Sequence, residues 1–104
     1  MMPTNPSYSA DGLQPARVVA DLTALRQLTG DADGAQRVAW TEIWQRARAW
    51  ERERLADLPV TFETDEAGNQ WVTLRGRSDK TLLIGGHIDS IPNGGWLDGC
   101  LNLI

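Results

Sequence analysis

The sequence predicts an α/β fold with a mixed β-sheet. Three observations lead to this prediction: apolar residues at helical spacing in the first half of the chain, two alternating segments that suggest a hairpin, and a continuous apolar run at 82–84. A strand that is apolar on both faces is typical of the centre of a sheet that helices cover on both sides. The order helix, helix, hairpin, buried strand and helix start indicates the α/β class.

Length and composition limit the chain to one small domain. The 104 residues are 41% hydrophobic, and their net charge of −4 gives no sign of the basic surface that binds nucleic acid. A single cysteine, Cys100, excludes an internal disulfide and fits a reducing compartment. The polar start lacks the apolar core of a signal peptide, and no apolar run approaches the length of a membrane span. We therefore expect a soluble, cytoplasmic protein that binds neither membranes nor nucleic acid.

The first helix is expected to begin at Pro15. Residues 1–13 are polar and contain two prolines, so we expect a disordered lead-in there. Proline suits the first turn of a helix, and Gly30 is a favourable stop at its end, followed by a loop at 31–34. The role that we assign to this helix is packing. Its apolar positions are Val18, Leu22, Leu25 and Leu28 or Thr29.

A second helix is expected to begin after Thr41, whose side chain can cap it. Glu42 in the first turn interacts favourably with the helix dipole. Charges of both signs alternate between residues 46 and 54, which favours a solvated helix face over one that binds nucleic acid. Pro59 ends the helix.

Two alternating segments, 60–64 and 70–74, flank a short polar stretch and predict a β-hairpin with a turn at Gly68 and Asn69. Asp65 and Glu66 are adjacent carboxylates in this turn. Their position favours solvation over metal binding.

The candidate site lies in Thr81–Gly99, which reads T-L-L-I-G-G-H-I-D-S-I-P-N-G-G-W-L-D-G. Side chains two apart in an extended chain point the same way, so His87 and Asp89 can face one site. Imidazole is the commonest metal ligand, and its second nitrogen usually donates to a partner such as Asp89. The glycines of the loop allow Asp98 to return to the same place. Its two oxygens can bridge two cations about 3.5–4 Å apart.

These residues carry a resemblance to a known family. Residues 86–92 (G-H-I-D-S-I-P) and 93–99 (N-G-G-W-L-D-G) resemble the first metal-binding segment of the dinuclear metallopeptidase/amidohydrolase superfamily. The short P-N-G-G-x-x-D-G loop is similar to the branch of N-carbamoyl-L-amino-acid hydrolases, β-ureidopropionases and allantoate amidohydrolases. The resemblance extends back through 65–69 and 37–41 and covers about the last two-thirds of the chain.

The resemblance implies a fold, an activity and a role for each residue. Residues 14–104 would be the N-terminal portion of a three-layer αβα zinc-hydrolase catalytic domain. His87 would ligate one metal ion, Asp89 would orient His87, and Asp98 would bridge two divalent ions. Zinc is the first expectation, and manganese, cobalt or nickel are alternatives because His and Asp accept them all. The substrate would be a small ureido or N-carbamoyl compound whose non-peptide C–N bond is hydrolysed. Asn102 departs from the pattern, because many relatives have glycine there.

Family members complete the centre with a glutamate pair, a further acidic or histidine ligand and a distant histidine, none of which can be assigned in this chain. They also carry a later lid and dimerisation domain, and full-length relatives are homodimers, while the oligomeric state of this chain stays open. We therefore expect an incomplete catalytic domain that is inactive alone and binds metal weakly.

Two other function classes stay open. Cys100 follows Asp98 at the expected helix start and could act as a thiol nucleophile with His87 and Asp89. Alternatively, the chain is a non-catalytic piece that binds a partner through exposed tryptophans. The tryptophans are Trp40, Trp44, Trp50, Trp71 and Trp96, the last of which could instead line a substrate pocket.

Overall fold

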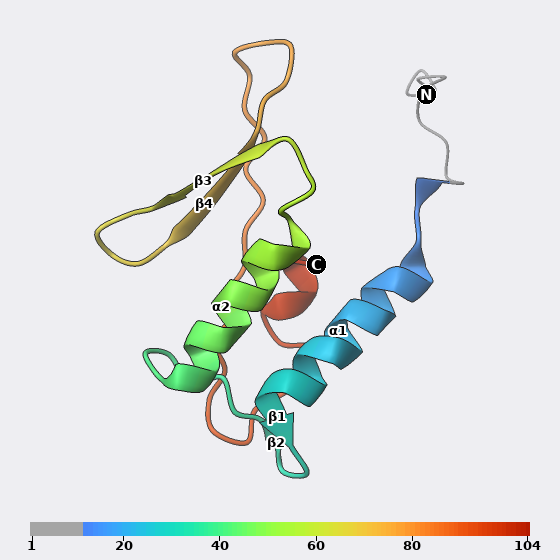
Figure 1. Cartoon of the computed structure of the whole chain (residues 1–104), viewed down its shortest axis with the longest axis vertical. Coiled ribbons are helices and arrows are strands. Elements are labelled where there is room, and N and C mark those ends of the chain that lie inside the picture. The colour runs from blue at the N-terminus through green and yellow to red at the C-terminus, as the bar shows by residue number, and fades with distance from the viewer. Residues whose placement is uncertain (1–11) are drawn as a thin grey trace.

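The computed structural model describes residues 12–104. Most of the expected lead-in, residues 1–11, lies outside the described residues. The regular elements of the described part are two helices, two short antiparallel sheets and a 3₁₀ turn (Figure 1). In chain order the elements are α1 (Pro15–Thr29), β1 (Gly30–Asp31), β2 (Gly34–Ala35), α2 (Glu42–Arg54), β3 (Val60–Thr64), β4 (Gln70–Leu74) and a 3₁₀ turn (Cys100–Asn102). None of the helices within 12–104 is long and apolar enough to cross a membrane.

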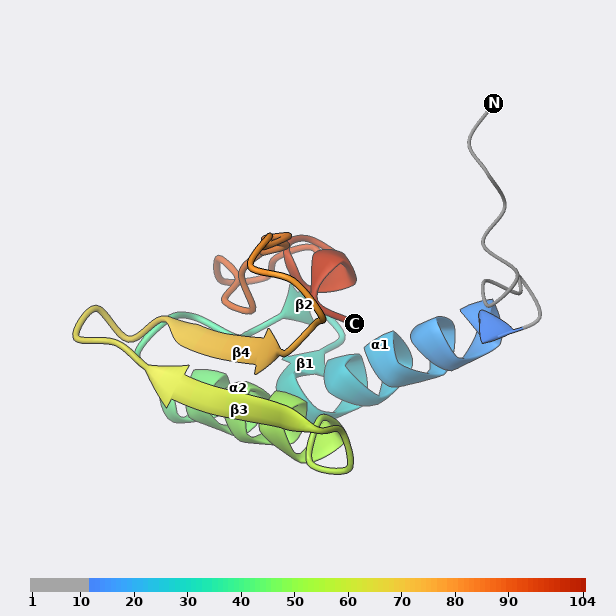
Figure 2. The same ribbon diagram turned by 90° about the horizontal axis from the view of Figure 1, so that it is seen from above.

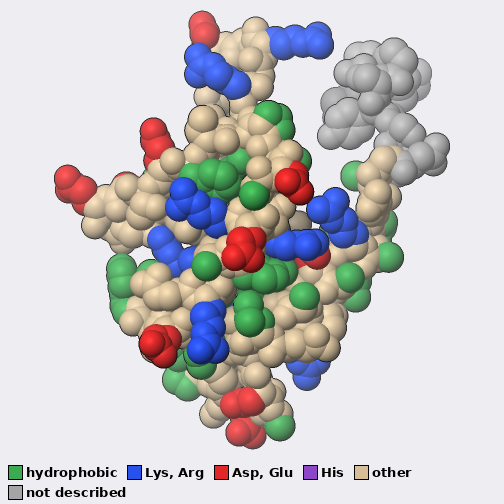
Figure 3. All heavy atoms as spheres, viewed as in Figure 1, with side chains coloured by type: hydrophobic (Ala, Val, Ile, Leu, Met, Phe, Trp, Pro, Cys, Tyr) green, Lys and Arg blue, Asp and Glu red, His purple; other side chains and the backbone are tan. Residues whose placement is uncertain are grey.

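Both predicted helices are confirmed, and both begin where expected. The second helix ends at Arg54, earlier than the predicted stop at Pro59, and residues 55–59 form turns and bends. Pro15 opens α1, and Gly30 follows its last residue with an N–H that donates to the carbonyl of Arg26. The Thr41 hydroxyl accepts a hydrogen bond from the backbone N–H of Trp44 at 3.3 Å and caps α2. Basic and acidic side chains are interspersed on the face shown in Figure 3, as expected for solvated helix surfaces.

The core lies where α1 and α2 pack side by side (Figure 1). The C-terminal turn covers the two helices, so residues far apart in sequence share the core. Its buried members are Leu22, Leu25, Trp44, Ala47, Ile88 and Cys100. Ile88 and Cys100 lie at the two ends of residues 88–100, which we call the candidate metal loop. This loop is therefore anchored in the core at both of its ends.

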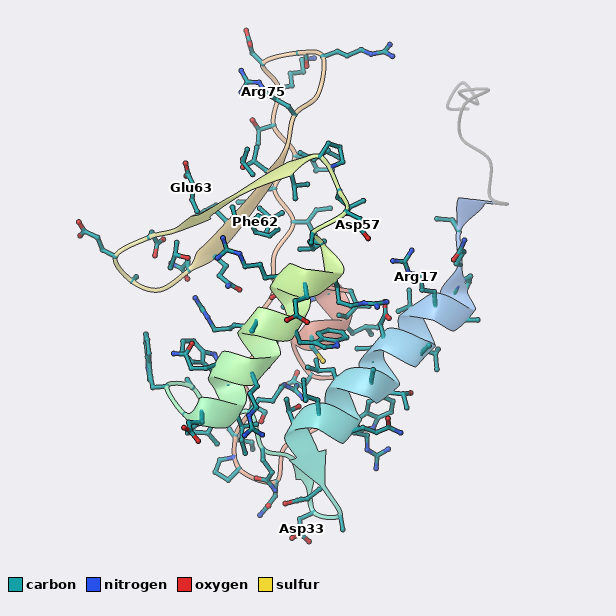
Figure 4. All side chains as sticks on the ribbon, viewed as in Figure 1. Arg17, Asp33, Asp57, Phe62, Glu63 and Arg75 are labelled. Carbon is teal, nitrogen blue, oxygen red and sulfur yellow. The ribbon has the colours of Figure 1, made fainter. Side chains whose placement is uncertain are left out.

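The hairpin is confirmed with strands β3 and β4 in register from Val60 opposite Leu74 to Thr64 opposite Gln70. It lies over α2 (Figure 2). Phe62 faces that helix, where the guanidinium of Arg52 lies 5.0 Å from its ring centroid, while Glu63 points away (Figure 4).

Residues 30–35 form more structure than the predicted loop. Strands β1 and β2 pair as a minimal antiparallel ribbon, with Gly30 opposite Ala35 and Asp31 opposite Gly34. Ala35 also pairs with Gly94 of the candidate metal loop. This short ribbon joins α1 to that loop.

The prediction of a buried central strand at 82–84 is wrong. None of residues 75–92 belongs to a strand, and Leu82, Leu83 and Ile84 are 84%, 72% and 73% exposed. A strand needs hydrogen-bonding neighbours, and both sheets within residues 12–104 are two-stranded and antiparallel. The apolar run has no sheet to join here, so the expected mixed sheet does not form among these residues. The described residues combine helices with small antiparallel sheets.

Candidate functional site

His87 and Asp89 meet, as the sequence predicts. His87 Nδ1 lies 2.9 Å from the backbone oxygen of Asp89 and 3.2 Å from its Oδ1. Both neighbours are hydrogen-bond acceptors, so Nδ1 must carry the ring hydrogen of the neutral imidazole. Nε2 then holds the free lone pair. Both side chains are about half exposed.

The glycine loop brings the chain back against His87. Gly99 has a φ of +76°, and a Cβ added there would lie 2.5 Å from Cε1 of the His87 ring and collide with the His87 carbonyl. Asp98, the residue before Gly99, is exposed. Within residues 12–104, no group of three or more His, Cys, Asp or Glu side chains is arranged to hold a metal ion. The structure thus brings His87 and Asp89 into contact, and it places Gly99, the neighbour of Asp98, against the His87 ring.

Residues 35–37 run alongside the loop and fix its path. Ala35 and Gly94 exchange backbone hydrogen bonds of 2.8 and 2.9 Å. The Ser90 N–H donates to the carbonyl of Arg37 at 2.9 Å, and the Ser90 hydroxyl accepts from the Arg37 N–H at 3.0 Å. The Gln36 side chain bonds the Asn93 side chain and backbone at 2.8 and 3.1 Å. The site therefore rests on this segment and not on a central strand.

Arg37 is a functional candidate that the sequence reasoning missed. Its side chain is fully buried beneath the site. Nε donates to the carbonyl of Ile88 at 2.7 Å, and Nη2 lies 3.6 Å from Cys100 Sγ. No local signal in the sequence marked it, because Arg17 also precedes three apolar residues and is exposed.

A pocket of about 300 Å³ lies beside the site, and His87 and Asp89 form part of its wall. Trp40, Trp44 and Arg48 also line it. The Arg48 guanidinium stacks 4.4 Å from the Trp44 ring centroid and donates to the carbonyl of Gly68 at 2.8 Å. These pocket residues were not predicted, because they come from α2 and the segment before it and reach His87 only through the fold.

Glu51 of α2 is a further carboxylate in the pocket wall. Burial raises the pKa of its carboxyl, and the charge of Arg48 opposes that rise.

The tryptophans do not form one exposed surface. Trp40 and Trp71 are 73% and 45% exposed, whereas Trp44 is buried. Trp50 and Trp96 are partly buried against the core. The guanidinium of Arg26 lies 5.1 Å from the ring centroid of Trp96. Trp96 does not line the pocket beside His87.

Cys100 is poorly suited to nucleophilic attack. It is fully buried, and its Sγ donates to the carbonyl of Trp96 at 3.0 Å. Burial raises the pKa of the thiol, although the nearby Arg37 charge lowers it in part. A thiol nucleophile needs an accessible thiolate, so this environment disfavours the thiol-hydrolase alternative.

Two curated proteins resemble this chain in sequence. Allantoate amidohydrolase of Bacillus subtilis (strain 168) is 29% identical over 83 residues, which are 77% of this chain and 20% of that protein. Allantoate amidohydrolase of Escherichia coli (strain K12) is 33% identical over 70 residues, 65% of this chain and 17% of that protein. No family model and no solved structure matches the chain. The chain is thus similar to allantoate amidohydrolases over most of its own length, and it spans a fifth or less of the length of these relatives.

Proposed function

We propose that this chain is part of a metal-dependent amidohydrolase that cleaves a non-peptide C–N bond of a ureido or N-carbamoyl compound. The observation that carries the proposal is the pairing of His87 Nδ1 with both oxygen acceptors of Asp89. This pairing leaves Nε2 as a metal ligand, the arrangement common to histidines in metal centres. The similarity to two proteins named allantoate amidohydrolase supports the substrate class.

The donors present fit part of a divalent-metal centre. His87 offers one neutral imidazole nitrogen, and Asp98 offers an exposed carboxylate on a loop that returns to the His87 ring. Nitrogen and carboxylate donors suit zinc, and also manganese, cobalt or nickel. His87 and Asp98 would hold two such ions together with ligands from other parts of the protein. Such ions would supply a water molecule of lowered pKa and would polarise the substrate carbonyl.

In this proposal, the residues of this chain orient the His87 ring and bind the substrate. Asp89 keeps the His87 hydrogen on Nδ1 and fixes the ring plane. The pocket beside His87 is the place that we assign to the substrate, since its volume of about 300 Å³ suits a small molecule. Trp40 and Trp44 offer apolar faces there, and Arg48 offers a cation for an acidic group of the substrate.

We further propose that residues 14–104 are the N-terminal portion of a three-layer αβα catalytic domain. The exposed run 82–84 would then become a strand between neighbours supplied by other segments of the protein. Two metal ligands are too few for a tight dinuclear centre, so the 104 residues alone should hydrolyse no substrate.

Calorimetric titration with zinc tests the metal centre in the 104-residue chain. We expect weak binding that His87→Ala and Asp98→Asn each abolish, while Asp79→Asn, an exposed carboxylate elsewhere, leaves it unchanged. Tight binding of two ions would refute the incomplete centre, and binding that survives His87→Ala would refute the assigned ligand.

The reaction is tested on the polypeptide as its gene expresses it, by ammonia release from allantoate and from N-carbamoyl amino acids. Release that a chelator stops and zinc restores supports the proposal. Release that survives the chelator but not Cys100→Ala would assign thiol chemistry instead.

A further inference from the structure

Among residues 12–104, Arg37 is a buried cation without a carboxylate partner. Its relative exposure is 0%, and Nη1 has no hydrogen-bond partner among residues 12–104. Removing a guanidinium from water is unfavourable unless an anion and a full set of acceptors replace the water. An apolar side chain of similar length would fill this space at a lower desolvation cost. Stability alone therefore does not explain an arginine here.

The contacts of Arg37 join the two ends of the candidate metal loop. Nε donates to the carbonyl of Ile88, the residue after His87. Nη2 lies 3.6 Å from Sγ of Cys100, which follows Gly99. The backbone of Arg37 bonds both the N–H and the hydroxyl of Ser90. The Arg37 side chain thus links the Ile88 carbonyl, one residue after His87, to the Cys100 sulfur, two residues after Asp98.

A guanidinium suits this task because of its shape. Its donors are fixed in one plane and point in different directions, so a single rigid group can hold two acceptors at a set separation. A lysine has one compact ammonium on a flexible stem and cannot hold both acceptors in the same way. The neighbouring contact is tight, because Gly99 lies directly against the His87 ring. A small shift between the two ends of the loop would therefore move the imidazole.

We propose that Arg37 is a positioning residue for the metal centre. It holds Ile88 and Cys100 together and thereby keeps His87 Nδ1 on Asp89 and Nε2 free. This inference rests on the proposed function, since it assigns Arg37 to the site that His87 and Asp98 would form. It does not require that Arg37 touch metal or substrate.

The ring tautomer of His87 reports this role directly. His87 is the one histidine of the chain, so its imidazole nitrogens give unambiguous signals in ¹⁵N NMR spectra. We would record them without metal at a pH of about 8.5, where a free imidazole is neutral. The variants are Arg37→Lys and Arg37→Met, with Arg46→Met, an exposed arginine of α2, as the matched control. Urea unfolding of each variant measures stability separately.

The wild type and Arg46→Met should show the Nδ1–H tautomer. Both Arg37 variants should shift toward the mixture of tautomers found in free imidazole, and Arg37→Met should do so while the fold stays intact. Zinc should bind these variants about tenfold more weakly, at the lower end of what lost orienting contacts cost. An unchanged tautomer in folded Arg37 variants would overturn the proposal.

If the Arg37 variants do not fold, Cys100→Ala tests the proposal instead. It removes one of the two groups that the Arg37 side chain contacts and leaves the arginine itself in place. A tautomer shift of His87 in Cys100→Ala supports the positioning role of Arg37, and an unchanged tautomer overturns it. The metal-free measurement also separates two failures. A wild type that has the Nδ1–H tautomer and binds no zinc contradicts the proposed function, while a tautomer shift in the Arg37 variants would still show that Arg37 orients the His87 ring.

Discussion

At the scale of single residues, the candidate site depends on which nitrogen of His87 carries the hydrogen. Two oxygen acceptors of Asp89 surround Nδ1, at 2.9 and 3.2 Å. The His-x-Asp spacing predicted this pairing, because alternate residues of an extended segment face the same side. Arg37 could not be predicted, since its contacts with Ile88 and Cys100 span 51 and 63 residues of sequence.

Asp89→Asn should weaken zinc binding by about 10- to 100-fold, the usual effect of losing a carboxylate that orients a metal-bound histidine. The amide keeps the size of the side chain and leaves the backbone oxygen in place, but it removes the carboxylate charge that lies 3.2 Å from Nδ1. Calorimetric titration measures the change, and Asp79→Asn is the control. Equal affinities of the wild type and Asp89→Asn would contradict the role of Asp89.

Gly99→Ala should disrupt the site, because the added methyl would overlap the His87 ring and φ at this position is +76°. We expect a loss of more than about 1 kcal/mol in the free energy of unfolding, together with loss of zinc binding. Gly76→Ala is the matched control, since an added Cβ there meets no atom within 4 Å. A Gly99→Ala chain as stable as Gly76→Ala would show that the loop does not pack on His87.

At the scale of elements, local sequence signals predicted both helices and the hairpin. Pro15 and Thr41 act at helix starts, where caps depend on neighbours only a few residues away. The turn of the hairpin is equally local, because Asp65 accepts hydrogen bonds from Ala67, Asn69 and Trp71. The apolar run 82–84 was mispredicted as a strand, since a strand depends on partners that local sequence does not reveal.

The hairpin should lose stability in acid. Hydrogen bonds from the Trp71 and Asn69 side chains and from nearby backbone N–H groups lower the pKa of Asp65 from 3.8 to about 2. Because the pKa in the folded hairpin lies below the ordinary value, the ionised carboxylate stabilises the fold above pH 3.8. That stabilisation is lost as the pH falls through about 2.

Amide hydrogen exchange in β3 and β4 measures this effect as the pH falls from about 4 to about 2. After correction for intrinsic exchange, protection should decrease in the wild type and in Glu66→Gln. It should be low and nearly constant in Asp65→Asn. A decrease of equal size in Asp65→Asn would mean that another group is responsible.

At the scale of the whole molecule, the chain divides into a packed part and an exposed apolar segment. The two helices and the loop 88–100 share one core, and the ribbon β1–β2 is bridged to that loop through Ala35 and Gly94. Leu82, Leu83 and Ile84 lie outside it and are strongly exposed. An exposed segment with apolar side chains and unpaired backbone N–H and C=O groups readily pairs with other chains.

The 104-residue chain should therefore associate as its concentration rises, and Leu83→Lys should reduce this association by placing a charge in the exposed run. Its stability should not change, because Leu83 is 72% exposed. Val19→Lys on α1, at a position 59% exposed, is the control. Sedimentation velocity measures the association, and equal behaviour of the two variants would show that residues 82–84 are not the contact.

The most direct test of the account is where a divalent ion binds. Adding Mn²⁺ to the ¹⁵N-labelled chain broadens the NMR signals of nuclei close to the bound ion. The account predicts that the ring nitrogens of His87 and the amides of Asp98 and Gly99 broaden first, and that His87→Ala removes this selective effect. Broadening that begins at other carboxylates, such as Asp33 or Glu66, while His87 stays sharp would contradict it.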